Sequence, residues 1–441
     1  MATVLMVPLM LYLLAVLAGR HVHCKSTGAA ADGLYDVTEY GAAPSRKDNK
    51  DVSALLQTGL AASCVFRSFL NPCVVFPCHH SPPLTFQAFL AAWRAACSST
   101  AGNATLLIPE GTFAVGAVEF SGPCKSGGAP VVVIDGVLRP CTGGCHLTDD
   151  DWITFSALSN LLVTGAGTLD GQGGARTNNA KTTTLELDGV TNSTVRGLRF
   201  VDSRGFHLSF HRSSRVAAEG LRIHAPASSR NTDGIHVGCS SHVRIADSVI
   251  GTGDDCVSVG PGSSDVVVTG IICGPGHGIS VGSLGRKEGE EDVRGLVIRN
   301  CTVRGTTNGL RIKTWPGSPP GRASNITFED IIMANVSNPI LIDQRYCPHG
   351  RCSDVDKPSR VQISDVTFRR IQGTSSSKVA VQLRCSEEQP CSGVRLDGIN
   401  LRCGDQPCHA QFANVRGAPA LEAQAPSLWV QEAHGLPSDA E

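Results

Sequence analysis

The sequence has few aromatic residues, few methionines and almost no net charge. Aromatic residues make up 5% of the 441 residues, methionine occurs 4 times, and the formal net charge is −1. Because the charges balance, no global field would draw the chain to nucleic acid or to an anionic membrane. If the ligand is a polyanion, local cations must recognise it. No cysteine pair has zinc-finger spacing, and we expect no metal and no cofactor.

The chain contains a single long apolar run, from Thr3 to Gly19, which ends in small residues. The run is slightly too short to span a bilayer, and no second run follows it. We therefore predict a secretory signal over residues 1–24, whose removal leaves no membrane segment. An uncleaved anchor is the alternative.

The 18 cysteines of an exported chain predict disulfides, although their pairing cannot be deduced from sequence. Three close pairs are spaced to close small loops: Cys347/Cys352, Cys385/Cys391 and Cys403/Cys408. Cys239 and Cys256 bracket the coil that carries Asp254 and Asp255. Five N-x-S/T sequons are compatible with export: Asn103, Asn192, Asn300, Asn325 and Asn335.

A high glycine content and a loosely repeated phrase predict many short strands joined by turns. From about residue 155, a small polar turn is followed by alternating β-branched residues and a second apolar run, at steps of 22–35 residues. This period predicts a β-solenoid, which needs end caps. Ala88–Cys97 has the spacing of a short N-terminal capping helix, and residues 25–441 are expected to form one all-β domain. The equivalent positions of the repeats are Leu198, Leu221, Val249, Ile271, Thr302, Ile331, Val366 and Ile399.

Residues 52–87 do not fit the repeats. They lack the solenoid phrase and carry three cysteines. Val52-Ser53 is compatible with a 5′ splice signal, and the segment before Ala88 with a pyrimidine tract ending in CAG. We therefore consider a retained intron translated in frame, with a genuine variable loop as the alternative.

Four short motifs lie within about 80 residues of one another. Asp233 and Asp254 are 21 residues apart, and Asp254 and His277 are 23 residues apart, which is about one coil in each case. Residues one coil apart stack at the interstrand spacing of about 4.8 Å. The motifs are therefore predicted to form one patch with three carboxylates, one imidazole and two cations. They are Asn231-Thr-Asp233-Gly, Gly253-Asp254-Asp255-Cys256, Gly276-His277-Gly278 and Arg311-Ile-Lys313.

Such a patch suits acid–base cleavage of a glycosidic bond. Neighbouring carboxylates cannot all ionise freely, so one of them is expected to hold a proton beside an ionised one. One carboxyl then protonates the leaving oxygen while another activates water. Arg311 and Lys313 lie at i and i+2, on one face of a strand. Two cations there favour a sugar acid over a neutral sugar.

In this order and spacing the motifs resemble those of polygalacturonases, the enzymes of glycoside hydrolase family 28. The surrounding phrases NTDGIHV, IGTGDDCVSVG and NPILIDQRYC are similar to plant members, and the resemblance covers Tyr35–Asp51 and Ala88–Leu401. It implies a single-stranded right-handed parallel β-helix, the pectin-lyase-like solenoid. It also implies a secreted, monomeric cell-wall enzyme that hydrolyses α-1,4 bonds of homogalacturonan (pectin) with inversion.

The resemblance assigns roles to individual residues. Asp254 would be the general acid, Asp233 and Asp255 would hold and activate the water, and His277 would tune the acid and bind substrate between two glycines that admit a ligand. The remaining substrate-binding residues would be Asn231, Arg311, Lys313 and Tyr346, with the two cations at the sugar carboxylate. In this family the carboxyls lie closer together than the roughly 6.5–9.5 Å usual for inverting enzymes.

Some features depart from the family pattern, and several functions remain open. Ala43-Pro-Ser-Arg replaces the usual GDG, the aromatic pair expected after Gly173 is absent, and the tail beyond Pro407 fits poorly. The phrase GTTNGLRIKTWPGSPPG resembles exo-acting plant members, so exo action is expected over endo action. The alternatives are a rhamnogalacturonan or xylogalacturonan hydrolase, a calcium-dependent pectate lyase, and an inactive wall-associated β-helix protein.

Overall fold

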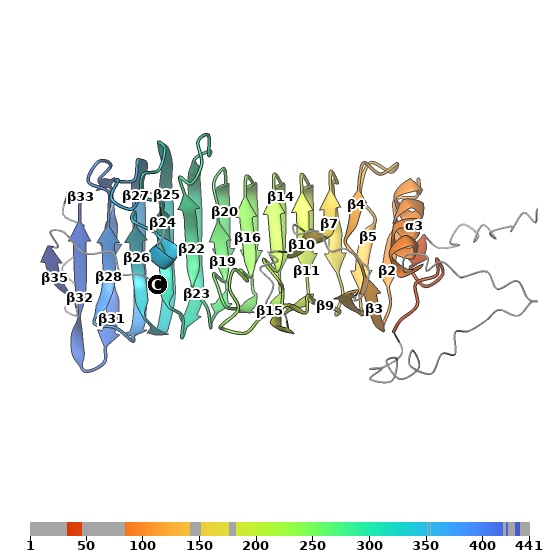
Figure 1. Cartoon of the computed structure of the whole chain (residues 1–441), viewed down its shortest axis with the longest axis horizontal. Helices are drawn as coiled ribbons and strands as arrows, with labels where there is room; N and C mark the ends of the chain where they lie inside the picture. The colour runs from red at the N-terminus through yellow and green to blue at the C-terminus, as the bar shows by residue number, and fades with distance from the viewer. Residues whose placement is uncertain are drawn as a thin grey trace, which may run out of the picture.

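A computed structural model describes residues 33–45, 84–141, 151–175, 182–350, 352, 354–417, 420–421 and 428–432. These residues form one stack of coils along the long axis, with a helix at the N-terminal end and the last strands at the other (Figure 1). The ladders between successive coils are parallel, and the predicted right-handed parallel β-helix is confirmed. The predicted signal at residues 1–24 lies outside the described residues.

The coils build three sheets that run along the stack. Sheet I comprises β4 (Val118–Ser121), β7 (Asp151–Ser156), β10 (Thr183–Asp188), β13 (Leu208–His211), β16 (Ile235–Gly238), β19 (Val257–Val259), β22 (Ile279–Leu284), β24 (Asn308–Thr314), β26 (Asn338–Asp343), β28 (Val379–Arg384), β32 (Gln406–Ala413) and β35 (Leu428–Glu432). Sheet II comprises β1 (Leu34–Asp36), β2 (Thr105–Ile108), β5 (Val131–Ile134), β8 (Leu162–Thr164), β11 (Thr191–Arg196), β14 (Ser214–Glu219), β17 (Ser241–Ala246), β20 (Ser264–Thr269), β29 (Cys391–Ser392), β30 (Arg395–Asp397), β33 (Val415–Arg416) and β34 (Ala420–Leu421). Sheet III comprises β3 (Thr112–Val115), β6 (Val137–Pro140), β9 (Thr168–Asp170), β12 (Arg199–Val201), β15 (Arg222–His224), β18 (Val249–Gly251), β21 (Ile272–Cys273) and β31 (Asn400–Cys403). Three long strands bend across sheets II and III: β23 (Val293–Arg304), β25 (Gly321–Val336) and β27 (Val361–Ser375). Two short 3₁₀ turns complete the elements, at Gly173–Ala175 and Pro348–Gly350.

The inward positions of sheet I are filled by apolar residues stacked coil on coil. Ile235, Val257, Ile279, Leu310 and Ile340 are register partners and are at most 1% exposed. Burying one such side chain contributes roughly 1.5–3 kcal/mol. Each coil buries these side chains against its neighbours, so the stability is spread along the stack. The alternate residues of sheet I point outward, where their side chains are able to form a functional site.

The observed register corrects three of the eight positions that the repeats predicted to be equivalent. The equivalent residues are Ser248, Cys301 and Ile371 instead of Val249, Thr302 and Val366. Val366 is also buried, but it pairs with Ile326 and not with Ile331. Val249 points outward and is 44% exposed, whereas Ser248 is 1% exposed. The buried Ser248 hydroxyl is satisfied because it donates to the Ala246 carbonyl at 2.8 Å and accepts from the Leu221 N–H at 3.0 Å. The sequence alignment of the repeats missed this serine because it matched apolar residues only.

The bend between sheets II and III repeats a left-handed backbone conformation in successive coils. Asp247, Gly270, Asn300, Asp330 and Arg370 have φ values of 51°, 67°, 52°, 57° and 52°. Glycine, asparagine and aspartate adopt this conformation most readily, which explains the small polar turn of each repeat. Arg370 is the exception, and its guanidinium donates two hydrogen bonds to the Asp330 carboxylate at 2.6 and 2.8 Å.

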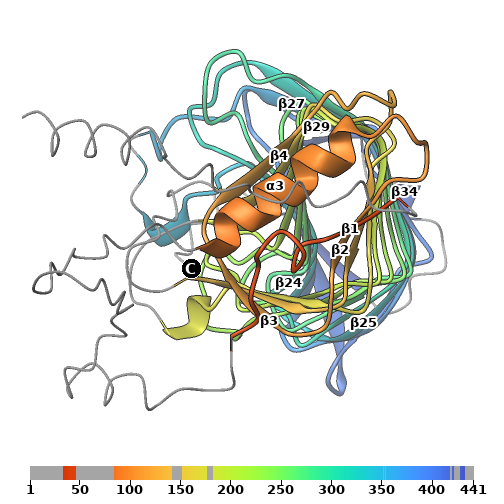
Figure 2. The same ribbon diagram turned by 90° about the vertical axis from the view of Figure 1, so that its right-hand side faces the viewer.

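Helix α3 (Leu84–Ser98) lies across the N-terminal opening of the coils (Figure 2). It contains the predicted capping helix and begins four residues earlier. Phe89 and Trp93 are 1% and 3% exposed and pack on aromatic rings of the first coils at centroid distances of 5.2–6.0 Å. The disulfide between Cys97 and Cys124 ties the end of the helix to the solenoid. The cap therefore closes the N-terminal end of the core.

The predicted insertion at residues 52–87 is described only from Leu84 onward. Residues 84–87 form the first turn of α3, and Phe86 packs against the core. The expected boundary between Gln87 and Ala88 thus falls inside one continuous helix. The rest of the segment lies outside the described residues.

The disulfides confirm the three short loops predicted from sequence, at Cys347–Cys352, Cys385–Cys391 and Cys403–Cys408. Cys256 pairs with Cys273 in the next coil, and Cys239 and Cys301 carry free thiols. In the described part of the chain, no helix has the length and apolar character needed to cross a membrane.

Candidate active site

The predicted motifs occupy equivalent positions at one edge of sheet I. Asp233, Asp255 and His277 each lie two residues before the strand that follows them, namely β16, β19 and β22. The first residues of these strands are register partners, so the three residues form one column over successive coils. Asp254 stands beside Asp255 in the same turn, and the cationic motif lies within β24. The structure thus brings the four motifs together.

Asp254 and His277 form the accessible part of the site. Nδ1 of His277 lies 3.0 Å from Oδ1 of Asp254, and the two side chains are 34% and 21% exposed. Backbone N–H groups of Asn231 and Asp255 also donate to this carboxylate, at 3.2 and 2.8 Å. Burial opposes its ionisation, but the hydrogen bond and charge of His277 outweigh burial and lower the pKa of Asp254 to about 2. The same hydrogen bond raises the pKa of His277.

Asp255 is buried in a cluster of donors. Its Oδ1 accepts from Nη2 of Arg311 at 3.0 Å and from Oγ of Ser280 at 2.7 Å, and its Oδ2 accepts from Nζ of Lys313 at 2.8 Å. Arg311 and Lys313 are only 2% and 6% exposed. The sequence predicted that both cations face a sugar carboxylate, whereas here both hold a carboxylate of the chain itself.

Asp233 is the carboxyl whose surroundings most favour the neutral acid. Burial, followed by the charges of Asp254 and Asp255, raises its pKa well above the ordinary value. A hydrogen bond from Oγ of Ser258, at 2.6 Å, opposes this increase. The expected raised pKa is therefore found at Asp233 and not at Asp254. With Asp233 neutral and His277 charged, the two remaining carboxylates face three cations, which leaves a net positive site.

Two serines that the sequence reasoning missed hold the buried carboxyls. His236, Ser258, Ser280 and Arg311 are register partners in one outward column of sheet I. Nδ1 of His236 lies 2.8 Å from Oγ of Ser258, and Nε of Arg311 donates to Oγ of Ser280 at 3.1 Å. Burial lowers the pKa of His236 to about 4, so the neutral ring donates to Ser258. The signal was the phrase Val-Ser-Val or Ile-Ser-Val directly after the Gly-Asp-Asp-Cys and Gly-His-Gly motifs.

The glycines around His277 serve the packing of adjacent coils. A Cβ added at Gly276 would lie 2.4 Å from the carbonyl oxygen of Asp254, and one added at Gly278 would lie 2.1 Å from that of Asn308. Both residues also have positive φ, at 136° and 83°. The close approach that sequence reasoning attributed to a ligand is therefore made by neighbouring backbone, and it fixes the position of His277.

Tyr346 follows β26 and covers the cationic pair. Its ring centroid lies 5.7 Å from the guanidinium carbon of Arg311 and 5.0 Å from Nζ of Lys313. Trp315 packs edge-on against this ring at 5.5 Å, and Arg286 lies 5.2 Å above the indole. Trp315 and Arg286 extend the wall of the site beyond the residues that the motifs predicted.

Ligand-type atoms of Asp254, Asp255 and His277 lie within 4.8 Å of one another. Both oxygens of Asp255 already accept hydrogen bonds from cations, and Nδ1 of His277 is bonded to Asp254. Because these ligand-type atoms already take part in hydrogen bonds and ion pairs, we assign no metal to them.

Two acidic side chains lie on the N-terminal half of the same face. Glu186 lies in the column of Ser209 and His236, two coils before His236, and Asp188 follows on the same strand. Burial, with Asp151 nearby, raises the pKa of Glu186 to about 7. Nε of Arg212 donates to Asp188 at 2.9 Å, and Nδ1 of His211 lies 3.3 Å from the same carboxylate, so basic side chains offset the charge of this patch.

Residues 97–422 match the family of glycosyl hydrolases family 28. The chain is 44% identical over 342 residues to an exopolygalacturonase of Platanus acerifolia, an alignment that spans 75% of this chain and 90% of that protein. It is 40% identical over 369 residues to a polygalacturonase of Medicago sativa, spanning 80% of this chain and 85% of the relative.

Solved structures share the fold. A polygalacturonase from Erwinia carotovora superposes with a TM-score of 0.60 at 23% identity, covering 74% of this chain and 92% of that structure. An endo-xylogalacturonan hydrolase from Aspergillus tubingensis gives a TM-score of 0.65 at 22% identity, covering 80% and 96%. At these identities the likeness establishes the fold alone.

Proposed function

The chain belongs to family 28 of the glycosyl hydrolases, and from this membership we propose that it hydrolyses α-1,4 bonds between galacturonates of pectin with inversion. The observation that carries the proposal is the open Asp254–His277 pair beside the buried Asp255–Arg311–Lys313 cluster. A proton donor next to fixed positive charge suits cleavage of a polymeric sugar acid. The names of the similar plant proteins support this substrate.

In the proposed reaction Asp254 delivers a proton to the glycosidic oxygen as the bond from that oxygen to the anomeric carbon breaks. His277 replaces the proton, since its Nδ1 lies 3.0 Å from Asp254. Asp233 and Asp255 hold a water molecule that attacks the opposite face of the anomeric carbon and loses its proton to the Asp255 carboxylate, the ionised one of the two. Inversion follows because attack and departure occur on opposite faces.

The cations bind the substrate carboxylate in addition to Asp255. A lysine ammonium has three N–H donors, and Lys313 directs one of them to Asp255. Two carboxylates can therefore share the cationic pair, and Tyr346 lies over both cations to contact the sugar ring. Asn231 belongs to the same loop as Asp233 and lies beside Asp254, where its amide can bind a hydroxyl.

The release of reducing ends from polygalacturonic acid tests this proposal. The wild type should release them, and Asp254→Asn should reduce kcat by about 10²–10⁴, the usual contribution of a general acid. Products that absorb in the ultraviolet as unsaturated uronides would instead identify a lyase. Faster hydrolysis of xylogalacturonan or rhamnogalacturonan would identify that polymer as the substrate instead. Inactivity on all three polymers would favour a wall-associated binding protein.

We also propose that the enzyme attacks chain ends. The proposal rests on the phrases that resemble exo-acting members and on a relative named as an exopolygalacturonase.

Product profiling tests the exo proposal. Early samples should contain mainly monomer, and viscosity should fall slowly relative to reducing ends. A ladder of oligomers from the wild type at early times would contradict the proposal.

Export to the cell wall completes the proposal. The disulfides of the described chain require an oxidising compartment to form and persist. Recovery of active protein from the medium, with a mature N-terminus near residue 25, is the expected result. Retention of the active protein inside the cell would contradict it.

A further inference from the structure

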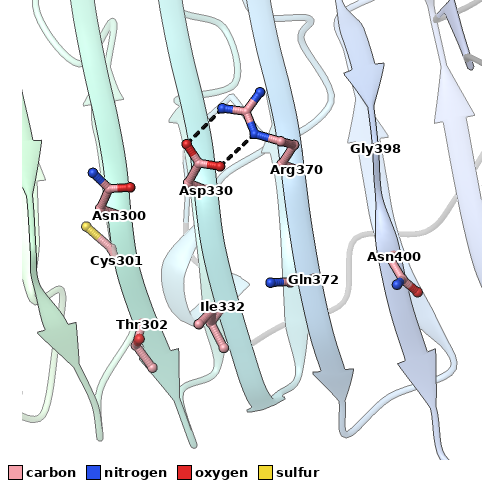
Figure 3. Close-up of a pocket in the computed structure, with 9 residues that line it drawn as sticks. All are labelled: Asn300, Cys301, Thr302, Asp330, Ile332, Arg370, Gln372, Gly398 and Asn400. Atoms are coloured by element: carbon pink, nitrogen blue, oxygen red, sulfur yellow. Dashed lines mark hydrogen bonds and ion pairs between the residues drawn. The ribbon is translucent and has the colours of Figure 1, made fainter.

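A groove follows the bend between sheets II and III, on a different face from the carboxylates. It has a volume of about 710 Å³, within the roughly 300–1,000 Å³ of ligand pockets. Figure 3 shows its lining, in which Asp330 and Arg370 pair while polar side chains of adjacent coils surround Ile332. Thr302, Gln372 and Asn400 supply the polar groups. The mixed lining suits sugars better than an apolar ligand.

A stripe of exposed apolar side chains adjoins this groove and enters its lining at Ile332. Val249, Ile272 and Ile332 are 44%, 39% and 48% exposed, and they account for three of the four exposed large hydrophobic residues in the described chain. They occupy one outward column, with Thr302 between Ile272 and Ile332. Scattered exposed apolar residues are ordinary, but three in one column, interrupted only by Thr302, favour a covered surface.

The sequon Asn300-Cys301-Thr302 lies in the middle of this groove. Asn300 is exposed at the bend, and its side chain makes no hydrogen bond within the described residues, as Figure 3 shows for the groove. Asn192, another sequon, instead donates its amide to Asn160 of the adjacent coil. Asn300 is therefore a sequon whose amide is free and points into a built groove.

The neighbours of Asn300 leave room for a substituent. On one side the equivalent residue is Gly270, which has no side chain, and on the other Asp330 is drawn to Arg370 by two hydrogen bonds. Cys301 faces the core, and its Sγ donates to the Arg299 carbonyl at 3.1 Å. Within the sequon, the Asn300 amide and the Thr302 hydroxyl therefore lie at the surface, whereas the Cys301 side chain does not.

We propose that Asn300 carries an N-linked glycan whose first sugars lie in this groove and cover Ile272 and Ile332. The hydroxyls of the sugars bind Thr302, Gln372 and Asn400, and their C–H faces pack on the isoleucines. The donor is a lipid pyrophosphate-linked oligosaccharide. The amide nitrogen forms a bond to the anomeric carbon, the lipid pyrophosphate leaves, and the amide loses one proton. The inference rests on the proposed export, because this donor belongs to the secretory pathway.

Mass spectrometry of the full chain secreted by a eukaryotic host tests the proposal. Treatment with peptide N-glycosidase in ¹⁸O-water should convert Asn300 to labelled aspartate. Thr302→Ser should retain the glycan, whereas Thr302→Val and Asn300→Asp should each lose it. Asp occupies this column already at positions 247 and 330, so Asn300→Asp preserves the turn. The deglycosylated protein should bind several-fold more of an apolar dye and self-associate at lower concentration.

The outcomes separate this inference from the hydrolase assignment. Secreted protein that degrades polygalacturonate with an unmodified Asn300 overturns the glycan and leaves the enzyme intact. Unglycosylated protein retained in the cell overturns the glycan together with export. If Asn300 is modified but glycan removal changes neither dye binding nor association, the glycan does not cover the stripe, and the proposed placement is wrong.

Discussion

Replacement of His277 by asparagine tests whether His277 and Asp254 hold the catalytic proton together. Nδ1 of His277 lies 3.0 Å from Oδ1 of Asp254. Asparagine keeps an N–H donor at about this position but cannot titrate. The substitution therefore removes the transferable proton while it preserves most of the hydrogen bonding around Asp254.

The expected effect follows from the pKa of Asp254, which is about 2. Near pH 5 only about one such carboxyl in a thousand is protonated, and protonating the rest costs about 4 kcal/mol. The imidazolium of His277 removes this cost, because its proton moves to Asp254 as Asp254 protonates the leaving oxygen. Since the pKa of His277 is raised, the alkaline limit of kcat/KM should lie above about pH 6.5.

In His277→Asn the alkaline limit should fall toward the pKa of Asp254 itself, which the loss of the His277 charge raises from about 2. Activity near pH 6 should drop by about 10²–10⁴, the range of general acid catalysis, and the deficit should shrink toward pH 4. Initial rates on polygalacturonate at constant ionic strength measure both limits. His211→Asn, on the same face but outside the site, is the control and should keep the wild-type profile. An unchanged alkaline limit in His277→Asn would refute the shared proton.

The same pair makes the stability of the protein depend on pH. The lowered pKa of Asp254 stabilises the fold above its ordinary value of 3.8 by about 2 kcal/mol, and this contribution is lost as the pH falls through about 2. The raised pKa of His277 stabilises the fold below 6.5, and its contribution is lost as the pH rises through the folded value. Thermal unfolding of the wild type and of His277→Asn should therefore differ most between about pH 4 and 6.5.

Two further substitutions test the buried carboxyls. Ser258→Ala removes a hydrogen bond to Asp233 worth about 0.5–1.5 kcal/mol, so kcat should fall about two- to tenfold and the pH profile should shift. Ser209→Ala, in the same column but bonded to Glu186, should preserve both. Asp255→Asn leaves two buried cations without their carboxylate, so the free energy of unfolding should fall by about 3–5 kcal/mol in denaturant titrations; an unchanged midpoint would contradict the buried pairing.

The fold could be predicted because every coil repeats the same physical requirement. Alternating β-branched residues and small polar turns recur at a period that fits stacked coils. The register could not be predicted to the residue, since a buried serine can replace an apolar side chain where backbone groups satisfy its hydroxyl. Ser248 does this with Ala246 and Leu221, and so Val249 was placed inward when it points outward.

The site was predictable as a set of residues but not as a set of contacts. The motif spacing placed the acids, the imidazole and the cations at one edge of a sheet. It did not reveal that Arg311 and Lys313 are committed to Asp255, because that pairing joins residues more than 50 positions apart. Nor did it show that burial selects Asp233 as the carboxyl with the raised pKa. Both properties depend on depth below the surface, which spacing does not encode.

The distance that matters in this solenoid is the distance from each motif to the strand that follows it. Asp233, Asp255 and His277 all stand two residues before a strand of sheet I. The loop excursion at residues 286–292 lengthens the next coil, yet Arg311 still pairs in register with Ser280. A coil can therefore absorb an insertion on its outer side without moving the site. One residue added between a motif and its strand would exchange inward and outward positions, because side chains alternate along a strand. The carboxylates would then lose their contacts with the outward side chains that hold them, namely Ser258, Ser280, Arg311 and Lys313.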